Sequence, residues 1–283
     1  MKVSIVLRTK NEGKLLRKTL NLIDKQHYSP RPELIIVDSG STDETLVIAS
    51  RHGGLSVLEL PAKEFTYGRA LNTGIRASGG DVTVALSAHA FPCGEHWLGR
   101  LVSHFDDPKV AGVYGRQLPQ EDAWPSVKRD YLEFYGQQPR IQTDSDNPND
   151  HRFSNSASAI RRSFWEEHPF DEDLPYCEDR EWARSMLMRG YKILYEPSAA
   201  VYHSHNESPV VVYRRCRQEM LARKLLHEEH GDSHLQWYRI WAQSVAADMS
   251  FVRKDGLDKK WLLWVLFYRL FWALGRSSHF LSR

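Results

Sequence analysis

The sequence predicts an α/β fold in which a mostly parallel sheet has helices on both faces, followed by a helical C-terminal region. Through the first 115 residues, short and continuously apolar runs alternate with segments of helical periodicity. This alternation is typical of parallel strands that are buried on both faces. From residue 207 onward the pattern is helical. With 283 residues, 41% of them hydrophobic, the chain is long enough for a large domain with an appendage.

The first half of the chain supplies most of the expected sheet. Apolar runs rich in β-branched residues predict strands over 3–7, 33–39, 55–60, 81–88 and 110–116. Helical patterns predict helices over 14–24, 42–53, 67–78 and 95–105, and the second of these opens with an acid-rich turn and stops at a glycine. Ligands of such sheets bind at the carboxyl ends of the strands. Residues 8–9, 38–40 and 87–89 are therefore expected along one rim.

The second half mixes strands with a long polar segment. Residues 137–152 are rich in Pro, Asn and Asp, which predicts a mobile loop and a candidate lid. Beyond it, the pattern predicts a strand over 153–162, a helix over 179–189 and two strands around Glu196-Pro197 within 192–205. We expect one domain over 1–205 and a helical region over 206–283.

Composition excludes several classes of protein. The net charge of +2 gives no general signal for nucleic-acid binding. Three widely spaced cysteines without a CxxC pair fit a reducing cytosol. The N-terminus does not resemble a signal peptide, and no run of about 18 uncharged apolar residues predicts a membrane span. We therefore expect a cytoplasmic protein.

The C-terminal segment 261–275 is apolar at every position except Arg269, and basic residues flank it. As a helix it would span about 22 Å, short of a hydrocarbon core of about 30 Å. Two interpretations stay open. The helix packs on the domain or on a second subunit, or it lies at a membrane surface, where Trp, Tyr and basic side chains suit the headgroup boundary.

Asp38 is the first candidate functional residue, because it ends a strand in the stretch IIVDSGSTDET. A carboxylate there can accept hydrogen bonds from a nucleobase or a ribose. Ser, Thr and Asp are also what an ordinary helix N-cap requires. The chain lacks the GxGxxG and GxxxxGK[ST] patterns, so the dinucleotide-binding and phosphate-loop classes are disfavoured.

Six segments taken in order resemble family 2 glycosyltransferases, in particular bacterial polysaccharide and rhamnosyl-type members with the GT-A fold. These segments are SIVLRTKNE, IIVDSGSTDET, YGRALNTGIRAS, SAHAFP, FSNSASAIRR and EDREWARSMLMRGYKILYEPSAAVYHSH. The similarity covers residues 3–225. It implies that a sugar is moved from a nucleoside-diphosphate donor to an acceptor hydroxyl with inversion at the anomeric carbon.

The resemblance also implies site residues for the donor. The residues implied for the nucleotide or donor are Thr9, Asn11, Glu12, Asp38, Arg69, Asn72, Ser87 and His89, while Arg116 and Asn155 are implied for the acceptor or donor sugar. The residue types agree with this, since a base and ribose need hydrogen-bond partners and a diphosphate needs cations. Arg69 also has an ordinary interpretation as a solvated helix arginine, and Arg116 and Asn155 can equally be structural.

The chain departs from its relatives at Ser87-Ala88-His89, where they usually carry an acidic DxD-like element that holds a divalent metal. His89 can ligate a metal when neutral or offset phosphate charge when protonated. Imidazole favours manganese over magnesium, so we expect a divalent metal, Mn²⁺ or Mg²⁺, if one is used. His203 and His205 would share a face if they lie on a strand, and either is a candidate partner of His89 at the metal.

Asp179, beside Glu178, is the candidate catalytic base, because the family's Glu-Asp pair matches these positions. Inverting transfer needs a base for the acceptor proton. The ordinary alternative is that acids begin the helix, where its dipole favours them and lowers their pKa; burial would raise it.

The expected partners are a nucleotide-sugar donor and a glycan or lipid-linked acceptor. The basic helix 213–226 and the aromatic segment 261–275 together favour a membrane surface, which would make the protein peripheral at the inner face of the cell membrane. The alternative function is a non-catalytic nucleotide-sugar-binding or scaffold subunit of a polysaccharide-assembly complex. A transferase that makes sugar nucleotides is disfavoured, because no Gly-rich loop follows the first strand.

Overall fold

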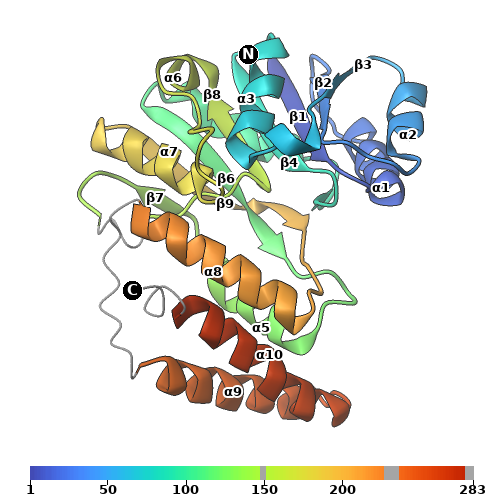
Figure 1. Ribbon diagram of the computed structural model, residues 1–283. Helices are drawn as coiled ribbons and strands as arrows, with labels where there is room; N and C mark the ends of the chain where they lie inside the picture. The colour runs from blue at the N-terminus through green and yellow to red at the C-terminus, as the bar shows by residue number, and fades with distance from the viewer. Residues whose placement is uncertain (147–150, 226–235, 278–283) are drawn as a thin grey trace. The chain divides into compact units, whose positions relative to one another are not determined.

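The computed structural model describes residues 1–146, 151–225 and 236–277, and the chain forms two compact units (Figure 1). The first unit comprises 1–117 and 135–203, and the second comprises 118–134 and 204–283. Residues 118–134, which the sequence places inside the first domain, group with the C-terminal helices instead.

The first unit is built on one mixed sheet. Its strands in the described residues are β1 Val3–Thr9, β2 Glu33–Asp38, β3 Leu55–Glu59, β4 Val82–Ser87, β5 Phe91–Pro92, β6 Val110–Leu118, β7 Arg140–Gln142, β8 Ala157–Arg161 and β9 Lys192–Tyr202. They lie in the order β3-β2-β1-β4-β8-β6-β9-β5, with β7 also paired to β9. β1 to β4 pair in parallel, whereas β8 runs antiparallel to β4 and β6, and β9 to β5 and β7.

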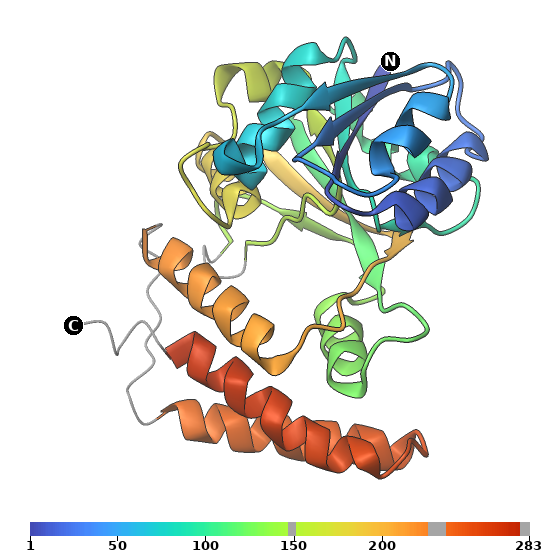
Figure 2. The same cartoon turned by 45° about the vertical axis from the view of Figure 1, so that its right-hand side comes forward.

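Helices cover both faces of this sheet, which confirms the predicted fold class. They are α1 Gly13–Asp24, α2 Thr45–Arg51, η1 Ala62–Glu64, α3 Tyr67–Ala77, α4 Trp97–Val102, η2 Ser103–Asp106, α6 Arg162–Glu167 and α7 Glu178–Met188. The face of β1 that carries Ile5 packs against α1, α2 and α4. α3 packs on the opposite face (Figure 2), where Gly74 lets it approach Val6 so closely that a Cβ would lie 2.3 Å from Cγ1 of that valine.

Several elements differ from the sequence-based expectations. α2 begins at Thr45, so the acids expected in its first turn precede the helix. The strand expected over 153–162 begins only at Ala157. The two strands expected around Pro197 are one continuous strand, β9. A proline is tolerated there because β7 pairs with β9 only as far as Tyr195 and β5 pairs with it only from Val201 onward. Among the described residues, this edge of β9 therefore has no strand neighbour at the proline.

The segment 137–152 is not a loop throughout. Residues 140–142 form β7, and the amide of buried Gln142 exchanges hydrogen bonds of 2.7 and 2.6 Å with the backbone of Arg152. The described part of the segment is therefore anchored to the sheet, contrary to the prediction of a mobile lid; residues 147–150 lie outside the described part of the chain.

The second unit consists of helices. They are α5 Pro125–Phe134, α8 Pro209–Leu225, α9 Gln236–Lys254 and α10 Lys260–Ser277. Gly275 lets α10 pack closely on α8, since a Cβ there would lie 2.6 Å from the Tyr213 carbonyl oxygen. None of the helices in the described residues is long and apolar enough to cross a membrane.

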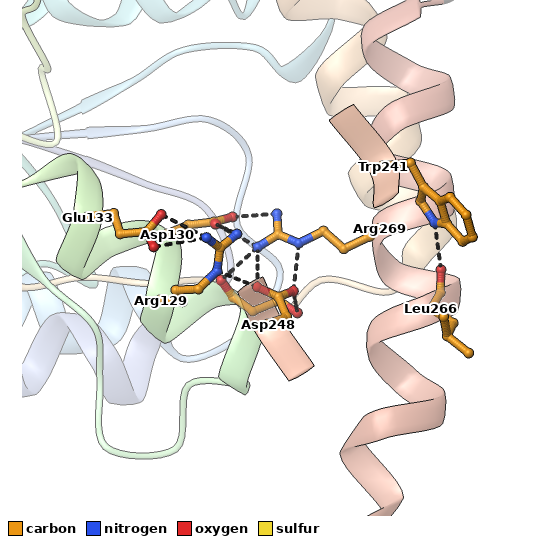
Figure 3. A network of polar contacts seen from close by, with 8 residues as sticks. Arg129, Asp130, Glu133, Trp241, Asp248, Leu266 and Arg269 are labelled. Carbon is orange, nitrogen blue, oxygen red and sulfur yellow. Dashed lines mark hydrogen bonds and ion pairs between the residues drawn. The ribbon is translucent and has the colours of Figure 1, made fainter. Parts of the chain in front are cut away.

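Arg269, the one charged residue of the apolar C-terminal segment, is buried rather than facing solvent. Its guanidinium binds Asp130 of α5 with two hydrogen bonds of 2.6 and 2.8 Å and also donates to Asp248 of α9 (Figure 3). Arg129 of α5 donates to the same Asp248 carboxylate. This network joins three helices, which supports the interpretation that α10 packs within the protein.

Candidate active site

Three parallel strands end at the same rim, as the sequence predicts. β1, β2 and β4 end at Thr9, Asp38 and Ser87, and the register pairs Thr9 with Asp38 and Arg8 with Ser87. After Ser87 the chain turns sharply, with the Ala90 N–H donating to the Ser87 carbonyl at 2.9 Å. This turn places His89 at the rim.

His89 lies between a carboxylate and a second imidazole. Its Nδ1 is hydrogen-bonded to the Glu12 carboxylate, and its Nε2 lies 3.0 Å from the His203 Nε2. The two rings are stacked, with centroids 4.9 Å apart. On its other side His203 Nδ1 lies 2.7 Å from the Gln117 Oε1. His203, one of the two histidines that the sequence offers as a partner of His89, therefore lies directly beside it.

These partners decide where the ring protons lie. A carboxylate and an amide oxygen only accept hydrogen bonds, so both Nδ1 atoms carry hydrogen. With this tautomer assignment, the two Nε2 atoms offer lone pairs to the space between the rings, where a cation would satisfy both. A nitrogen-to-metal distance of about 2.1 Å with a right angle at the ion would separate two ligand nitrogens by about 3.0 Å. The pair therefore fits a divalent metal.

His205 joins this group by a different route from the one the sequence suggests. β9 ends at Tyr202, so His203 and His205 do not share the face of a strand. Even so, one ring nitrogen from each of His89, His203 and His205 lies within 4.8 Å of the others. The loop after β9, rather than strand alternation, brings the third histidine close.

The loop after β2 is held by residues that the sequence assigns to the nucleotide. The buried Asp38 carboxylate accepts the Gly40 and Ser41 N–H groups at 3.0 and 2.8 Å. Asn11 adopts a left-handed conformation, with φ at 54°, and its side-chain oxygen accepts the Thr42 N–H at 2.7 Å. The Asp38 and Asn11 side chains thus fix the backbone conformation of the loop after β2.

Arg69 and Asn72 on α3 form hydrogen bonds with the segment that precedes α7. The fully buried Asn72 amide makes four hydrogen bonds, to Trp165, to the backbone N–H and carbonyl of Phe170, and to Glu172. Arg69 donates to Glu172 at 3.0 Å. These bonds use both donors and the oxygen of the Asn72 amide within the protein, which gives it a structural role, while its contact with the donor stays a prediction.

Glu178 and Asp179 begin α7 directly after Cys177, which adopts a left-handed conformation with φ at 67°. Asn155 joins the two acids: its backbone N–H donates to Asp179 at 3.3 Å and its side-chain amide to Glu178 at 3.4 Å. Asp179 also accepts the Arg180 N–H at 2.8 Å. The side chain of Glu178 is buried, whereas Asp179 is half-buried.

Burial dominates the electrostatics of this pair. It raises the pKa of Glu178 to about 7, and the neighbouring Asp179 charge adds to the shift. Burial also raises the pKa of Asp179, although hydrogen bonds from the Asn155 and Arg180 backbones oppose it. The lowering expected from the helix dipole is therefore exceeded. A carboxylate with a raised pKa is a better proton acceptor near neutral pH.

The two residues expected to contact the acceptor or donor sugar, Asn155 and Arg116, lie in different surroundings. Asn155 lies at the acid pair, whereas the half-buried Arg116 donates a hydrogen bond from its Nε to the Tyr135 carbonyl at 3.1 Å.

Three residues near the site were not predicted as functional. Gln117 and Ser154 are hydrogen-bonded to each other at 2.8 Å behind His203, and no sequence pattern distinguishes them. Arg8 was expected only as a rim residue; a cation at the end of a buried central strand is the signal that singles it out.

Comparison with solved structures shows the fold. The chain superposes on a Pyrobaculum calidifontis mannosyltransferase in complex with GDP-Man and Mn²⁺, with a TM-score of 0.68 and 19% identity over 100% of this chain and 88% of that one. For Staphylococcus aureus TarS in complex with UDP-GlcNAc, the TM-score is 0.61 at 16% identity, over 100% and 93% of the two chains. The fold is GT-A.

Sequence comparison gives the family. The model of glycosyl transferase family 2 matches residues 4–168. The O-antigen chain rhamnosyltransferase RfbN of Salmonella typhimurium is 34% identical over 76% of this chain and 70% of its own length, and WbaN of Salmonella anatum is 34% identical over 75% and 69%. The chain therefore belongs to glycosyl transferase family 2 and is a glycosyltransferase.

Proposed function

We propose that the protein transfers a sugar from a nucleoside-diphosphate donor to a hydroxyl of a glycan or lipid-linked acceptor, with inversion, in bacterial polysaccharide synthesis. The observation that supports this most is the pairing of a half-buried Asp179 with a buried Glu178 on a GT-A sheet that also carries a histidine pair. The names of the two Salmonella relatives favour a deoxysugar such as rhamnose as the transferred group.

Asp179 acts as the general base in this proposal. Displacement at the anomeric carbon needs a carboxylate that takes the acceptor's proton during attack. Asp179 is the more accessible of the two acids, and two backbone N–H groups orient it. Glu178, with its pKa near 7, is partly protonated at neutral pH, which limits the negative charge around the base.

The histidine pair acts at the leaving group. His89 and His203 would hold a divalent cation such as Mn²⁺ through their facing Nε2 atoms, and that ion would supply positive charge to the departing diphosphate. Glu12 and Gln117 orient the two rings through their Nδ1 atoms, as the hydrogen-bond partners of metal-ligating histidines commonly do.

The nucleotide lies at the rim between β1 and β2 in this account. Thr9, Asn11 and Asp38 shape that rim, and Ser87 borders it at the end of β4. The N–H groups and hydroxyls of residues 39–42 donate hydrogen bonds within the protein, so a base or ribose would be met there by oxygen acceptors. Arg69 and Arg116 stay proposals for donor and acceptor contacts, because both have protein partners in the structure.

α10 gives the second unit a candidate membrane surface. Leu263 and Phe267, one turn apart, are 67% and 58% exposed. Beside them, Trp124, Lys260, Trp261 and Trp264 line a shallow pocket of about 290 Å³. Exposed apolar side chains with aromatic and basic neighbours suit the boundary between headgroups and acyl chains, where a lipid-linked acceptor would be found. This would make the protein a peripheral one.

Asp179→Asn tests the proposed function. With a panel of UDP-, GDP- and dTDP-sugars and a bacterial membrane extract as the source of acceptor, we expect transfer to fall by about 10²- to 10⁴-fold, while donor binding measured by calorimetry is retained. The anomeric configuration of the wild-type product, read by NMR, tests inversion. Donor binding without transfer by the wild type would favour the scaffold alternative, and unchanged transfer by the variant would exclude Asp179 as the base.

A further inference from the structure

Arg8 is a charged residue in the centre of the sheet. It is the penultimate residue of β1, which lies between β2 and β4, and its register partners are Val37 and Ser87. Alternation along the strand places it on the same face as Val6, against which α3 packs. Its guanidinium lies 5.0 Å from the ring centroid of Tyr67, at the start of α3. The cation is thus fixed inside the fold at the ligand-binding rim.

The guanidinium lacks acceptors. Nη2 makes one long contact of 3.5 Å with the Asn155 carbonyl oxygen. Nε and Nη1 are buried from solvent and have no hydrogen-bond partner among the described residues. Leaving a buried charged donor unsatisfied is costly, and such groups in native proteins call for an explanation. Two guanidinium donors without a protein acceptor at the strand-end rim indicate that a ligand supplies the acceptor, once the guanidinium turns toward it.

The surroundings of Arg8 restrict what that ligand is. Asn155, whose carbonyl oxygen accepts the contact from Arg8 Nη2, also donates hydrogen bonds to both Asp179 and Glu178. The Arg8 charge is close enough to oppose the raised pKa values of both acids, yet in the described part of the chain it makes no ion pair with either. A phosphate at this position would face two carboxylates as well as the arginine. A neutral hydroxyl accepts from the arginine and donates to a carboxylate, so it suits both neighbours.

We propose that Arg8 binds hydroxyl oxygens of the sugar that is transferred, through Nε and Nη1, and so helps to select the donor sugar. This rests on the proposed function. In an inverting displacement the leaving diphosphate and the attacking hydroxyl lie on opposite sides of the anomeric carbon. The histidine pair would bind the leaving diphosphate, and Asp179 would accept the proton of the attacking hydroxyl. The sugar ring then lies between them, within reach of the Arg8 guanidinium.

The test separates the sugar from the nucleotide. Calorimetry measures the affinity of the donor sugar nucleotide and of the matching nucleoside diphosphate for the wild type, Arg8→Gln and Arg8→Lys. We expect Arg8→Gln to weaken the sugar nucleotide by about 10- to 100-fold, the loss typical of a charge-assisted hydrogen bond, and to leave the diphosphate unchanged. Arg8→Lys keeps the charge and should lose less. Arg76→Gln, an exposed arginine of α3 paired with Glu172, is the matched control.

A second measurement uses donors that lack one ring hydroxyl. The deoxy donor that misses the hydroxyl bound by Arg8 should bind wild type and Arg8→Gln equally. Equal losses for the sugar nucleotide and the diphosphate in Arg8→Gln would mean that Arg8 contacts phosphate, and would overturn the proposal. A shifted pH profile with unchanged sugar-nucleotide affinity would reduce Arg8 to a positioning residue for the acids and would also overturn it. Failure of the wild type to bind any of the nucleotides would count against the proposed function itself.

Discussion

Asn155 shows how single residues assemble this site. Its carbonyl faces Arg8, its backbone N–H binds Asp179 and its side-chain amide binds Glu178. This single residue, which precedes β8, therefore sets the distance between a cation and two acids. The sequence predicts the acids and Asn155 as site residues by resemblance, but no local pattern predicts that they meet. The same limit applies to Asn72, whose four internal hydrogen bonds depend on a segment almost a hundred residues away.

Glu178→Gln should make the protein more stable at neutral pH. The wild-type carboxyl has its pKa raised from 4.5 to about 7, so the folded state binds its proton more tightly than the unfolded state does. The free energy of unfolding of the wild type therefore falls as pH rises from about 4.5 to 7, and the variant, which has no such proton, escapes that loss. We expect a gain of about 3 kcal/mol at pH 7.5 that vanishes near pH 4.

Urea unfolding across pH 4 to 8 measures this difference. Glu166→Gln, which removes an exposed carboxylate paired with Arg162, is the control and should show little pH-dependent change, since exposed pairs contribute about 0 to 1 kcal/mol. A Glu178→Gln variant that is less stable than the wild type at pH 7.5 would mean that Glu178 is ionised and stabilising in the fold.

Among the elements, the sequence predicts best the part where strand and helix alternate along the chain. The first four strands and the helices between them follow from apolar periodicity, because β1, β2 and β4 are buried on both faces and β3 is half-buried at the sheet edge. The pattern fails where pairing is antiparallel and distant. β7 is three residues long and forms only because β9 passes beside it, and the strand around Pro197 continues only because one edge has no neighbour there.

Arg269→Met tests whether α10 is an integral part of the second unit. The substitution removes one of the two arginines that Asp130 and Asp248 share, leaving only Arg129 with them (Figure 3). Removing one partner of a buried ion pair typically costs about 3 to 5 kcal/mol. We expect a loss of that order in the free energy of unfolding, measured by urea titration followed by tryptophan fluorescence, because Trp261, Trp264 and Trp272 lie on α10.

The control for this substitution is Arg253→Met, near the end of α9, where the side chain is exposed and a change within about 0.5 kcal/mol is expected. Restoring stability by combining Arg269→Met with Asp248→Leu would identify the uncompensated buried charge as the cause. A single variant as stable as the wild type would mean that the network contributes nothing to folding.

At the scale of the whole molecule, we propose that a catalytic unit is joined to a helical unit that meets lipid. The sequence leaves open whether 261–275 packs inside the protein or lies on a membrane, and the structure allows both functions at once. One side of α10 is buried through Val265, Tyr268 and Arg269, while Leu263 and Phe267 stay exposed. Periodicity alone could not separate the two faces, because nearly every position is apolar.

The protein should therefore sediment with vesicles that contain anionic phospholipid, and less so at high salt, because exposed Lys259 and Lys260 lie at the start of the helix that carries Leu263 and Phe267. Replacing Leu263 and Phe267 together by serine should weaken binding by about 10-fold or more, given the apolar area removed. Leu132→Ser, which removes an exposed leucine of α5, is the control. Wild-type protein that stays in the supernatant at low salt would contradict the membrane surface.

The central claim is that the histidine pair and the strand-end rim bind the diphosphate of a sugar donor. Calorimetric titration of UDP, GDP and dTDP into wild type and His203→Ala, each with Mn²⁺ and with chelator, tests it most directly. We expect one nucleotide to bind the wild type with Mn²⁺, and its affinity to fall by about 10-fold or more in chelator or in the variant. Binding that neither the chelator nor the substitution changes would contradict the metal site, and no binding of any of the three would contradict the donor site itself.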